Sequence, residues 1–246
     1  METVKDVDAL SVPEHIPAEG GFVHFFGTRQ SPAVLVKTVH VGQVTPVPPD
    51  FPSVISVKQV HGKSVLVFDD PLASHATLTQ EGDALVTSQP HVLLVVRTAD
   101  CVPVLFADLQ NRVVAAVHAG WRGAVAGIVG ETLATLTQRY GTHAEHLRVA
   151  IGPSIGPCCF EVDGPVIDPI KAHYPYWAKV ISPVSSTHAT VDLKEFIVQQ
   201  LQHQGIALAA ISKSAACTQC DASRFFSYRR EGRVNGTMLS GIMLKP

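Results

Sequence analysis

The sequence predicts one α/β domain, a layered sandwich of mixed β-sheets with helices on its outer faces. Short apolar runs rich in Val, Ile and Phe recur about every ten residues, with Gly, Pro or Asp between them, as adjacent strands do. Two later stretches repeat their apolar residues with helical spacing. No linker, repeat or low-complexity tract interrupts the 246 residues, which are 46% hydrophobic and can bury a substantial core.

A polar leader is predicted over residues 1–20, and the single domain over 21–246. The strand-like runs of its first half are rich in β-branched and aromatic residues and end at turn-forming residues. The predicted strands are 21–26, 33–41, 53–59, 64–68, 83–87, 91–98, 102–107 and 112–119. Segment 45–52 contains four prolines and is expected to be a loop, because proline lacks a backbone donor.

Two amphipathic helices are predicted in the second half. The first spans about 123–140 and stops at Gly141. The second begins at Asp192, where Asp-Leu-Lys-Glu matches a capping box, and runs to about Gln204. The remaining predictions are strands at 147–151 and 206–212, a weaker helix at 165–173, a loop at 217–223, and one or two closing strands in 225–246.

The charge balance favours a small-molecule or protein partner. The formal net charge is −2 and the isoelectric point is near 6.6, so no basic field attracts nucleic acid or anionic lipid. The first twenty residues lack the apolar run of a secretory signal, and no window reaches the roughly 18 apolar residues of a membrane helix. We therefore expect a cytoplasmic protein, whose five cysteines stay mostly reduced.

The strongest candidate for chemistry is a Cys-His pair on two neighbouring strands. Cys101 precedes one predicted strand and His118 closes the next, so antiparallel pairing would bring thiol and imidazole to one sheet edge. The pair suits a nucleophile with its base, or two ligands of a soft metal. A buried cysteine is often inert packing, but the polar neighbours Thr98 and Asp100 are not what a core requires.

The hexapeptide His-Ala-Gly-Trp-Arg-Gly, which begins at His118, indicates a ligand-binding turn. Its glycines allow close backbone approach, Trp121 offers a stacking face, and Arg122 is expected at a helix N-terminus, which favours an anion such as phosphate. The plainer interpretation is a glycine turn with a surface arginine. His61, at a predicted strand end before Gly62, would by itself be an ordinary turn residue.

The remaining cysteines carry weaker signals. Cys158 and Cys159 are adjacent and could bridge only with strain, so structural thiols are the better interpretation. Cys217 and Cys220 form a lone CxxC without a partner pair, for which a redox or zinc role is the minor alternative.

Five sequence blocks together resemble one known family, the laccase-domain family. The blocks are KQVHG at 58–62, TADCVPVLF at 98–106, HAGWRG at 118–123, IGPSIGPCCFEV at 151–162 and FFSYRREG at 225–232. The family was called multicopper polyphenol oxidase and is now described as purine nucleoside phosphorylases with adenosine deaminase activity; bacterial members are also named peptidoglycan editing factors. The resemblance implies a sandwich similar to the cysteine-hydrolase-like toxin fold. Thr237 departs from the family, which commonly has arginine there, and the resemblance leaves the CxxC unexplained.

The resemblance also implies the site. The family's metal ligands fall on His61, Cys101 and His118, which would hold zinc, with copper as the alternative ion. The leading hypothesis is a zinc-dependent enzyme that phosphorolyses adenosine, inosine or methylthioadenosine and deaminates adenosine hydrolytically, with Asp100 as a proton carrier. The candidate contacts to the purine nucleoside and phosphate are Arg29, Trp121, Arg122 and Arg229.

Three alternatives stay open beside this hypothesis. One is a metal-free hydrolase that edits peptidoglycan precursors, with Cys101 as nucleophile and His118 as base. Another is a nucleoside-binding protein that is not an enzyme. The weakest is a copper-loaded polyphenol oxidase, because a multicopper centre uses many histidines, mostly in His-x-His pairs, and none of the twelve histidines forms such a pair.

Overall fold

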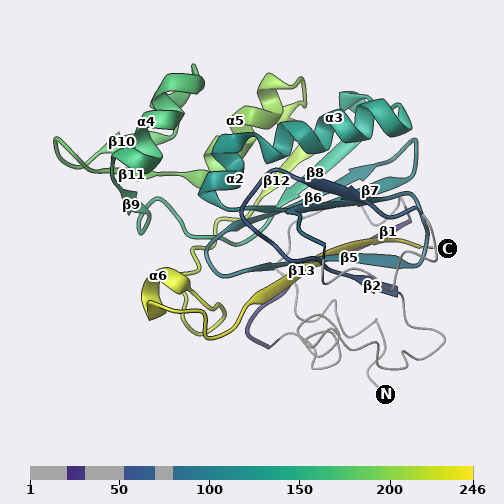
Figure 1. Ribbon diagram of the computed structural model, residues 1–246, viewed down its shortest axis with the longest axis horizontal. Helices are drawn as coiled ribbons and strands as arrows, with labels where there is room; N and C mark the ends of the chain where they lie inside the picture. Colours follow the sequence, from purple (N-terminus) through teal and green to yellow (C-terminus); the bar gives the residue numbers. More distant parts are fainter. Residues whose placement is uncertain (1–20, 31–52, 70–79, 246) are drawn as a thin grey trace.

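The computed structural model describes residues 21–30, 53–69 and 80–245. Within these ranges the chain forms three sheets, with four, six and three strands (Figure 1). The predicted leader 1–20, strand 33–41 and proline-rich loop 45–52 lie outside the described residues. No helix in the described ranges is long and apolar enough to cross a membrane.

The four-stranded sheet joins the two ends of the described chain. Its order is β1 (Phe22–Phe26), β13 (Met238–Leu244), β5 (Val92–Thr98) and β2 (Ser53–Ile55). β13 is antiparallel to both neighbours, whereas β2 is parallel to β5. The sheet is therefore mixed, as predicted.

The six-stranded sheet forms the next layer and carries the longest buried hairpin. Its order is β12 (Ile211–Lys213), β8 (Leu147–Ile151), β6 (Val102–Asp108), β7 (Val113–Ala119), β4 (Ala84–Thr87) and β3 (Val65–Val67). Every residue of β6 and β7 is buried, because the other sheet packs on one face and helices pack on the other. For this reason β6 and β7 are almost continuously apolar and do not alternate apolar with polar residues.

Helices cover the outer face of the six-stranded sheet (Figure 1). The predicted helix 123–140 is instead two helices, α2 (Trp121–Ala126) and α3 (Ile128–Tyr140). They are separated at Gly127, whose left-handed φ of 91° breaks the helical hydrogen-bond series. The second predicted helix is confirmed as α5 (Leu193–His203), where the Asp192 side chain accepts the N–H of Glu195 at 2.9 Å.

A smaller layer lies beside this sandwich. It combines the sheet β10 (Ile181–Pro183), β11 (Ala189–Val191) and β9 (Glu161–Val162) with helix α4 (Gly164–His173) and the 3₁₀ turn Trp177–Lys179. Helix α4 confirms the weaker helix prediction.

Two sequence predictions near the C-terminus were partly wrong. The predicted strand 206–212 is a 3₁₀ turn, Leu208–Ala210, before the short edge strand β12, which has a strand partner on one side only. The closing segment contains helix α6 (Tyr228–Glu231) before β13. Ser227 caps α6 by accepting the N–H of Arg230, and Gly232 ends it in a left-handed conformation. Local capping therefore overrides the strand tendency of the aromatic residues.

The core has two main parts separated by the six-stranded sheet. Between the two large sheets, buried side chains from both interlock, among them Phe26, Leu94, Leu105 and Ile242. On the other face, the alternate residues of β6 and β7 pack against α3, α5 and α4. The candidate site residues Cys101 and His118 lie at the end of this hairpin where β7 passes into α2.

Candidate functional site

The β6–β7 hairpin brings Cys101 and His118 together, as the sequence predicted. The strands pair antiparallel, with Pro103 opposite His118 and Val102 opposite Ala119. Cys101, directly before β6, therefore lies at the sheet edge where β7 ends. Cys101 is half-buried and His118 is buried.

His61 reaches the same edge from a separate segment. The side chain of Gln59 donates to the carbonyl of Arg97 at 2.7 Å and accepts the N–H of Arg97 at 2.8 Å, so this amide continues the pairing along β5. The chain then turns at His61, whose φ of 61° is left-handed. The turn directs an exposed imidazole toward the pair from the hairpin.

The three side chains form a donor set that fits a metal ion. The candidate ligand atoms of His61, Cys101 and His118 all lie within 4.8 Å of one another. The two imidazole rings meet edge to face, with centroids 4.8 Å apart and planes at 81°. Two imidazole nitrogens and one thiolate are ligands that zinc and copper accept, and a metal ion held by these three side chains would keep a coordination position for water or substrate.

Asp83 is the functional residue that sequence reasoning missed. It lies directly before β4, it is fully buried, and its Oδ1 accepts a hydrogen bond from Nδ1 of His118 at 2.8 Å. The same carboxylate accepts the N–H groups of His61 at 2.9 Å and Gly62 at 2.7 Å. A carboxylate on Nδ1 leaves Nε2 free for a metal, the usual arrangement around ligating histidines. An acidic residue at the head of an otherwise apolar strand is the signal that could have identified it.

The charges of the site depend on one another. Burial alone would raise the pKa of Cys101, but hydrogen bonds from His118 and His61 lower it to about 6. Burial alone would lower the pKa of His118, but Asp83 and the Cys101 thiolate raise it to about 9. Without a metal, the pair is therefore a thiolate beside an imidazolium over the pH range between these two values.

This ion pair predicts the pH behaviour of metal-stripped protein. Alkylation of Cys101 by iodoacetamide should rise with pH through a midpoint near 6, and His118→Gln should move the midpoint upward. The lowered Cys101 pKa contributes stability that is lost as pH falls through about 6. The raised His118 pKa contributes stability that is lost as pH rises through about 9. Peptide mapping of the alkylated protein checks the prediction, and an unchanged midpoint in the variant contradicts it.

Two glycines of the His-Ala-Gly-Trp-Arg-Gly turn are required by close contacts. A Cβ on Gly120 would lie 2.8 Å from Cδ2 of His61 and 3.1 Å from Sγ of Cys101. A Cβ on Gly123 would lie 2.6 Å from the carbonyl oxygen of Gly62. The turn is therefore pressed against the His61 segment, and side chains at these positions would separate the ligands.

We expect Gly123→Ala to displace the His61 turn. The added methyl group meets backbone rather than a movable side chain, so the variant should lose about 1–3 kcal/mol of stability and bind metal more weakly. Gly130→Ala is the matched control, because its Cβ would meet nothing closer than 4.0 Å; it should gain about 0.5–1 kcal/mol from helix propensity. Thermal denaturation and metal analysis of both variants decide the matter. Equal behaviour of the two would contradict the close-contact argument.

The arginines predicted to contact substrate differ in how far other groups of the protein already occupy their side chains. Arg122 is exposed on α2, its guanidinium carbon lies 4.2 Å from the ring centroid of Trp121, and its side chain makes no hydrogen bond to another described residue. Arg29 is ion-paired with Glu231 at 2.7 Å, and Arg229 donates to the carbonyl oxygens of Cys159 and Glu161. Of these three arginines, Arg122 therefore has the guanidinium most available to an anion.

Asp100 is held by its surroundings. Its backbone is left-handed, with φ of 91°. Its Oδ1 accepts the hydroxyl of Thr218 at 2.6 Å, and its Oδ2 accepts the hydroxyl of Ser227 at 3.0 Å and the N–H of Arg229 at 2.7 Å. These bonds fix the segment next to Cys101 to the C-terminal aromatic and arginine-rich segment. A role in carrying protons stays a prediction.

Comparison with known proteins connects this geometry to a family. The family profile described as Multi-copper polyphenol oxidoreductase laccase matches residues 29–245. A purine nucleoside phosphorylase from Bacteroides thetaiotaomicron is 35% identical over 196 residues, which cover 78% of this chain and 73% of the relative. Adenosine deaminase RL5, from an unknown prokaryotic organism, is 34% identical over 202 residues, which cover 80% of this chain and 77% of the relative.

Solved structures share the whole fold. The hypothetical protein YfiH of Bacillus licheniformis superposes with a TM-score of 0.81 at 29% identity, covering 91% of this chain and 93% of that one. YlmD from Geobacillus stearothermophilus gives a TM-score of 0.78 at 28% identity, covering 94% of both chains. The mixed-sheet fold and the resemblance carried by the five sequence blocks are thus confirmed, and the chain belongs to the Multi-copper polyphenol oxidoreductase laccase family.

Proposed function

We propose that this protein is a metal-dependent purine nucleoside enzyme that phosphorolyses adenosine, inosine or methylthioadenosine and hydrolytically deaminates adenosine. The observation that carries the proposal is the convergence of His61, Cys101 and His118, with Asp83 behind His118. The names of the relatives, purine nucleoside phosphorylase and adenosine deaminase, support the substrate class. The reduced cysteines of a cytoplasmic protein would keep Cys101 available as a ligand.

Three residues of the site would bind the metal ion, and Asp83 would orient one of them. His61, Cys101 and His118 would hold Zn²⁺, and the same donors suit copper. When bound, such an ion acidifies water and polarises oxygen atoms of a substrate. Asp83 would keep the Nδ1 proton of His118 in place and so fix which ring nitrogen faces the metal. The exposed edge of His61 leaves the site open to solvent and substrate.

Phosphorolysis needs a second set of contacts. A phosphate oxygen must bond to C1′ of the ribose while the bond from C1′ to N9 breaks and the purine leaves with the electron pair. Arg122 would bind the phosphate through its guanidinium N–H groups, and Trp121 would present its indole to the nucleoside. Deamination needs no phosphate, because water adds to C6 of adenosine and ammonia leaves.

This difference gives a sharp test. Purified protein incubated with adenosine should release inosine and ammonia, and with phosphate present it should also release free base and ribose 1-phosphate. Arg122→Ala should raise KM for phosphate at least tenfold, about 1.4 kcal/mol, and leave deamination within twofold. Arg139→Ala, which removes a guanidinium from the end of α3, is the control and should change neither reaction. Absence of both reactions in zinc-loaded protein would overturn the proposal.

The contacts of His118 with Cys101 and Asp83 support a second candidate function. Cys101, His118 and Asp83 also stand in the order of a nucleophile, its base and an orienting carboxylate, which suits a metal-free hydrolase acting on an amide. Such a mechanism gives no role to His61. Activity on an amide substrate that survives exhaustive chelation but is lost with iodoacetamide would favour the hydrolase. Loss on chelation with recovery on added zinc would favour the metal-dependent enzyme.

A further inference from the structure

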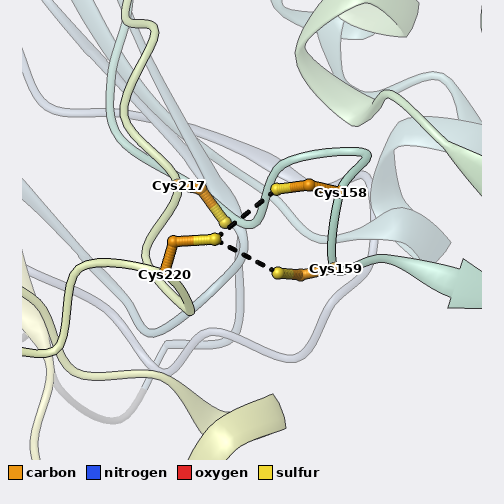
Figure 2. A group of neighbouring side chains, drawn as sticks. All are labelled: Cys158, Cys159, Cys217 and Cys220. Atoms are coloured by element: carbon orange, nitrogen blue, oxygen red, sulfur yellow. Dashed lines mark hydrogen bonds between the residues drawn. The ribbon is translucent and has the colours of Figure 1, made fainter.

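Four cysteines that looked unrelated in the sequence meet at one point. Cys158 and Cys159 come from the loop after β8, and Cys217 and Cys220 come from the loop after β12 (Figure 2). Their four sulfur atoms all lie within 4.8 Å of one another. We call this group the four-cysteine cluster. It shares no residue with the site of His61, Cys101 and His118.

The separations between the sulfur atoms match a single bound ion. Sγ of Cys220 is 3.6 Å from Sγ of Cys158 and 3.4 Å from Sγ of Cys159. A disulfide requires about 2.05 Å, so these thiols are not bonded. Four sulfurs at about 2.3 Å from a tetrahedral zinc ion lie about 3.8 Å from each other. In a [4Fe–4S] cluster each cysteine binds a different iron, and in a [2Fe–2S] cluster the four cysteines are divided between two irons, so both clusters spread the sulfurs more widely than a single ion does.

The two loops are built to bring the thiols together. Strands β8 and β12 are parallel neighbours, so the loops that follow them leave the sheet at the same edge. A backbone bridge between Ser154 and Cys217 continues this pairing beyond the strands. A Cβ on Gly156 would lie 3.2 Å from Cβ of Cys217 and 3.3 Å from Sγ of Cys158. Only a residue without a side chain allows this approach without displacing the cysteines.

A backbone donor already points at one of the sulfurs. The N–H of Gly156 donates to Sγ of Cys217 at 3.2 Å. A donor of this kind favours the thiolate form, which is the form that binds metal.

Three cations surround the cluster and bind its loops through carbonyl oxygens. Lys194 is buried and donates to the carbonyl of Ala216 at 2.7 Å. Arg230 donates to the carbonyls of Thr218 and Gln219, at 2.8 and 3.0 Å, and Arg229 donates to that of Cys159 at 3.2 Å. Four thiolates around one divalent ion carry a net charge of about −2. Among the described residues no carboxylate accepts a hydrogen bond from Lys194, although the charge of Asp192 acts on it, so a negatively charged cluster would further offset its burial.

We infer that the four-cysteine cluster binds a second metal ion, a structural Zn²⁺ held by Cys158, Cys159, Cys217 and Cys220. Four protein ligands leave no open position, so this ion takes no part in the chemistry. Its effect is mechanical: it joins two loops that the backbone bridge between Ser154 and Cys217 already holds side by side. Thr218, inside the CxxC, donates to Asp100, and Asp100 precedes Cys101. The ion therefore stiffens the wall beside the first site.

Metal analysis of three chains, each expressed in zinc-supplemented medium and purified under reducing conditions, tests this inference. The parent should contain about two zinc ions per chain, and His118→Ala should contain about one, held by the four-cysteine cluster. Cys217→Ser/Cys220→Ser should also contain about one, held by the other site, and should melt at a lower temperature than the parent. The His118→Ala arm makes this result independent of whether the protein turns over nucleosides.

A second measurement covers the case in which the double cysteine variant fails to fold. His118→Ala stripped of zinc and reloaded with Co²⁺ should show the strong thiolate-to-metal charge-transfer absorption of a four-thiolate site, and added zinc should abolish it. The inference would be overturned if His118→Ala took up no zinc on reconstitution, showed no such absorption with Co²⁺, and had all five thiols, the four of the cluster and Cys101, open to a thiol reagent. A disulfide within the cluster that persists in protein purified under reducing conditions, detected by intact mass, would overturn it as well.

Discussion

Replacing Cys101 with serine should lower nucleoside turnover about 10³-fold, since a metal ion at such a site supplies several kcal/mol of transition-state stabilisation. A hydroxyl is a far weaker ligand for zinc than a thiolate, and no other donor in the described part of the site replaces it. Zinc content should fall by one ion per chain while the fold persists. Steady-state kinetics and metal analysis of the same preparation give both values.

The two measurements separate the competing mechanisms. If Cys101 were a nucleophile in a metal-free hydrolase, the serine variant would lose activity but keep the zinc content of the parent. No other cysteine can serve as the control, because the remaining four form the four-cysteine cluster. The control is therefore a histidine: His143→Ala removes an exposed imidazole from the segment after α3. This variant should keep both activity and zinc. Turnover within tenfold of the parent in Cys101→Ser would contradict both mechanisms.

Replacing Asp83 with asparagine should damage both the fold and the metal site. The carboxylate accepts hydrogen bonds from His118, His61 and Gly62, and these bonds lower the pKa of Asp83 although burial alone would raise it. In asparagine one of the two oxygens becomes an N–H₂ group, which would face a donor. The expected losses are about 3 kcal/mol of stability and 10–100-fold in metal affinity. Urea denaturation and a zinc-competition titration measure the two effects.

Asp69 provides a matched control for Asp83. It is a carboxylate that, like Asp83, accepts from several donors, among them the N–H of Ser88 at 3.0 Å and the hydroxyl of Tyr140 at 2.8 Å, but it is only partly buried. It belongs to neither cysteine site. Asp69→Asn should therefore lower stability without changing zinc affinity. If both variants lost stability but neither lost zinc affinity, Asp83 would have no part in holding the metal ligand.

The local patterns of the sequence predicted most of the strands but misplaced several boundaries. Helix 123–140 was predicted as one element because its apolar residues keep a single period across Gly127. The period describes which face is buried, but it does not record the left-handed φ that divides α2 from α3. The strand predicted at 206–212 failed for a related reason: apolar character alone does not show that an edge strand has a partner for only three residues.

The sequence by itself determined the family and the mixed-sheet sandwich. It also determined that Cys101 meets His118, because two strands joined by a short turn can pair in few ways. Only the tertiary structure showed that Asp83 supports His118 across 35 residues and that Cys158 meets Cys220 across 62. Contacts at such separations depend on the order and direction of strands in a sheet, which no local spacing specifies. For this reason the CxxC looked isolated in the sequence, although its partner cysteines lie on the loop after the neighbouring parallel strand.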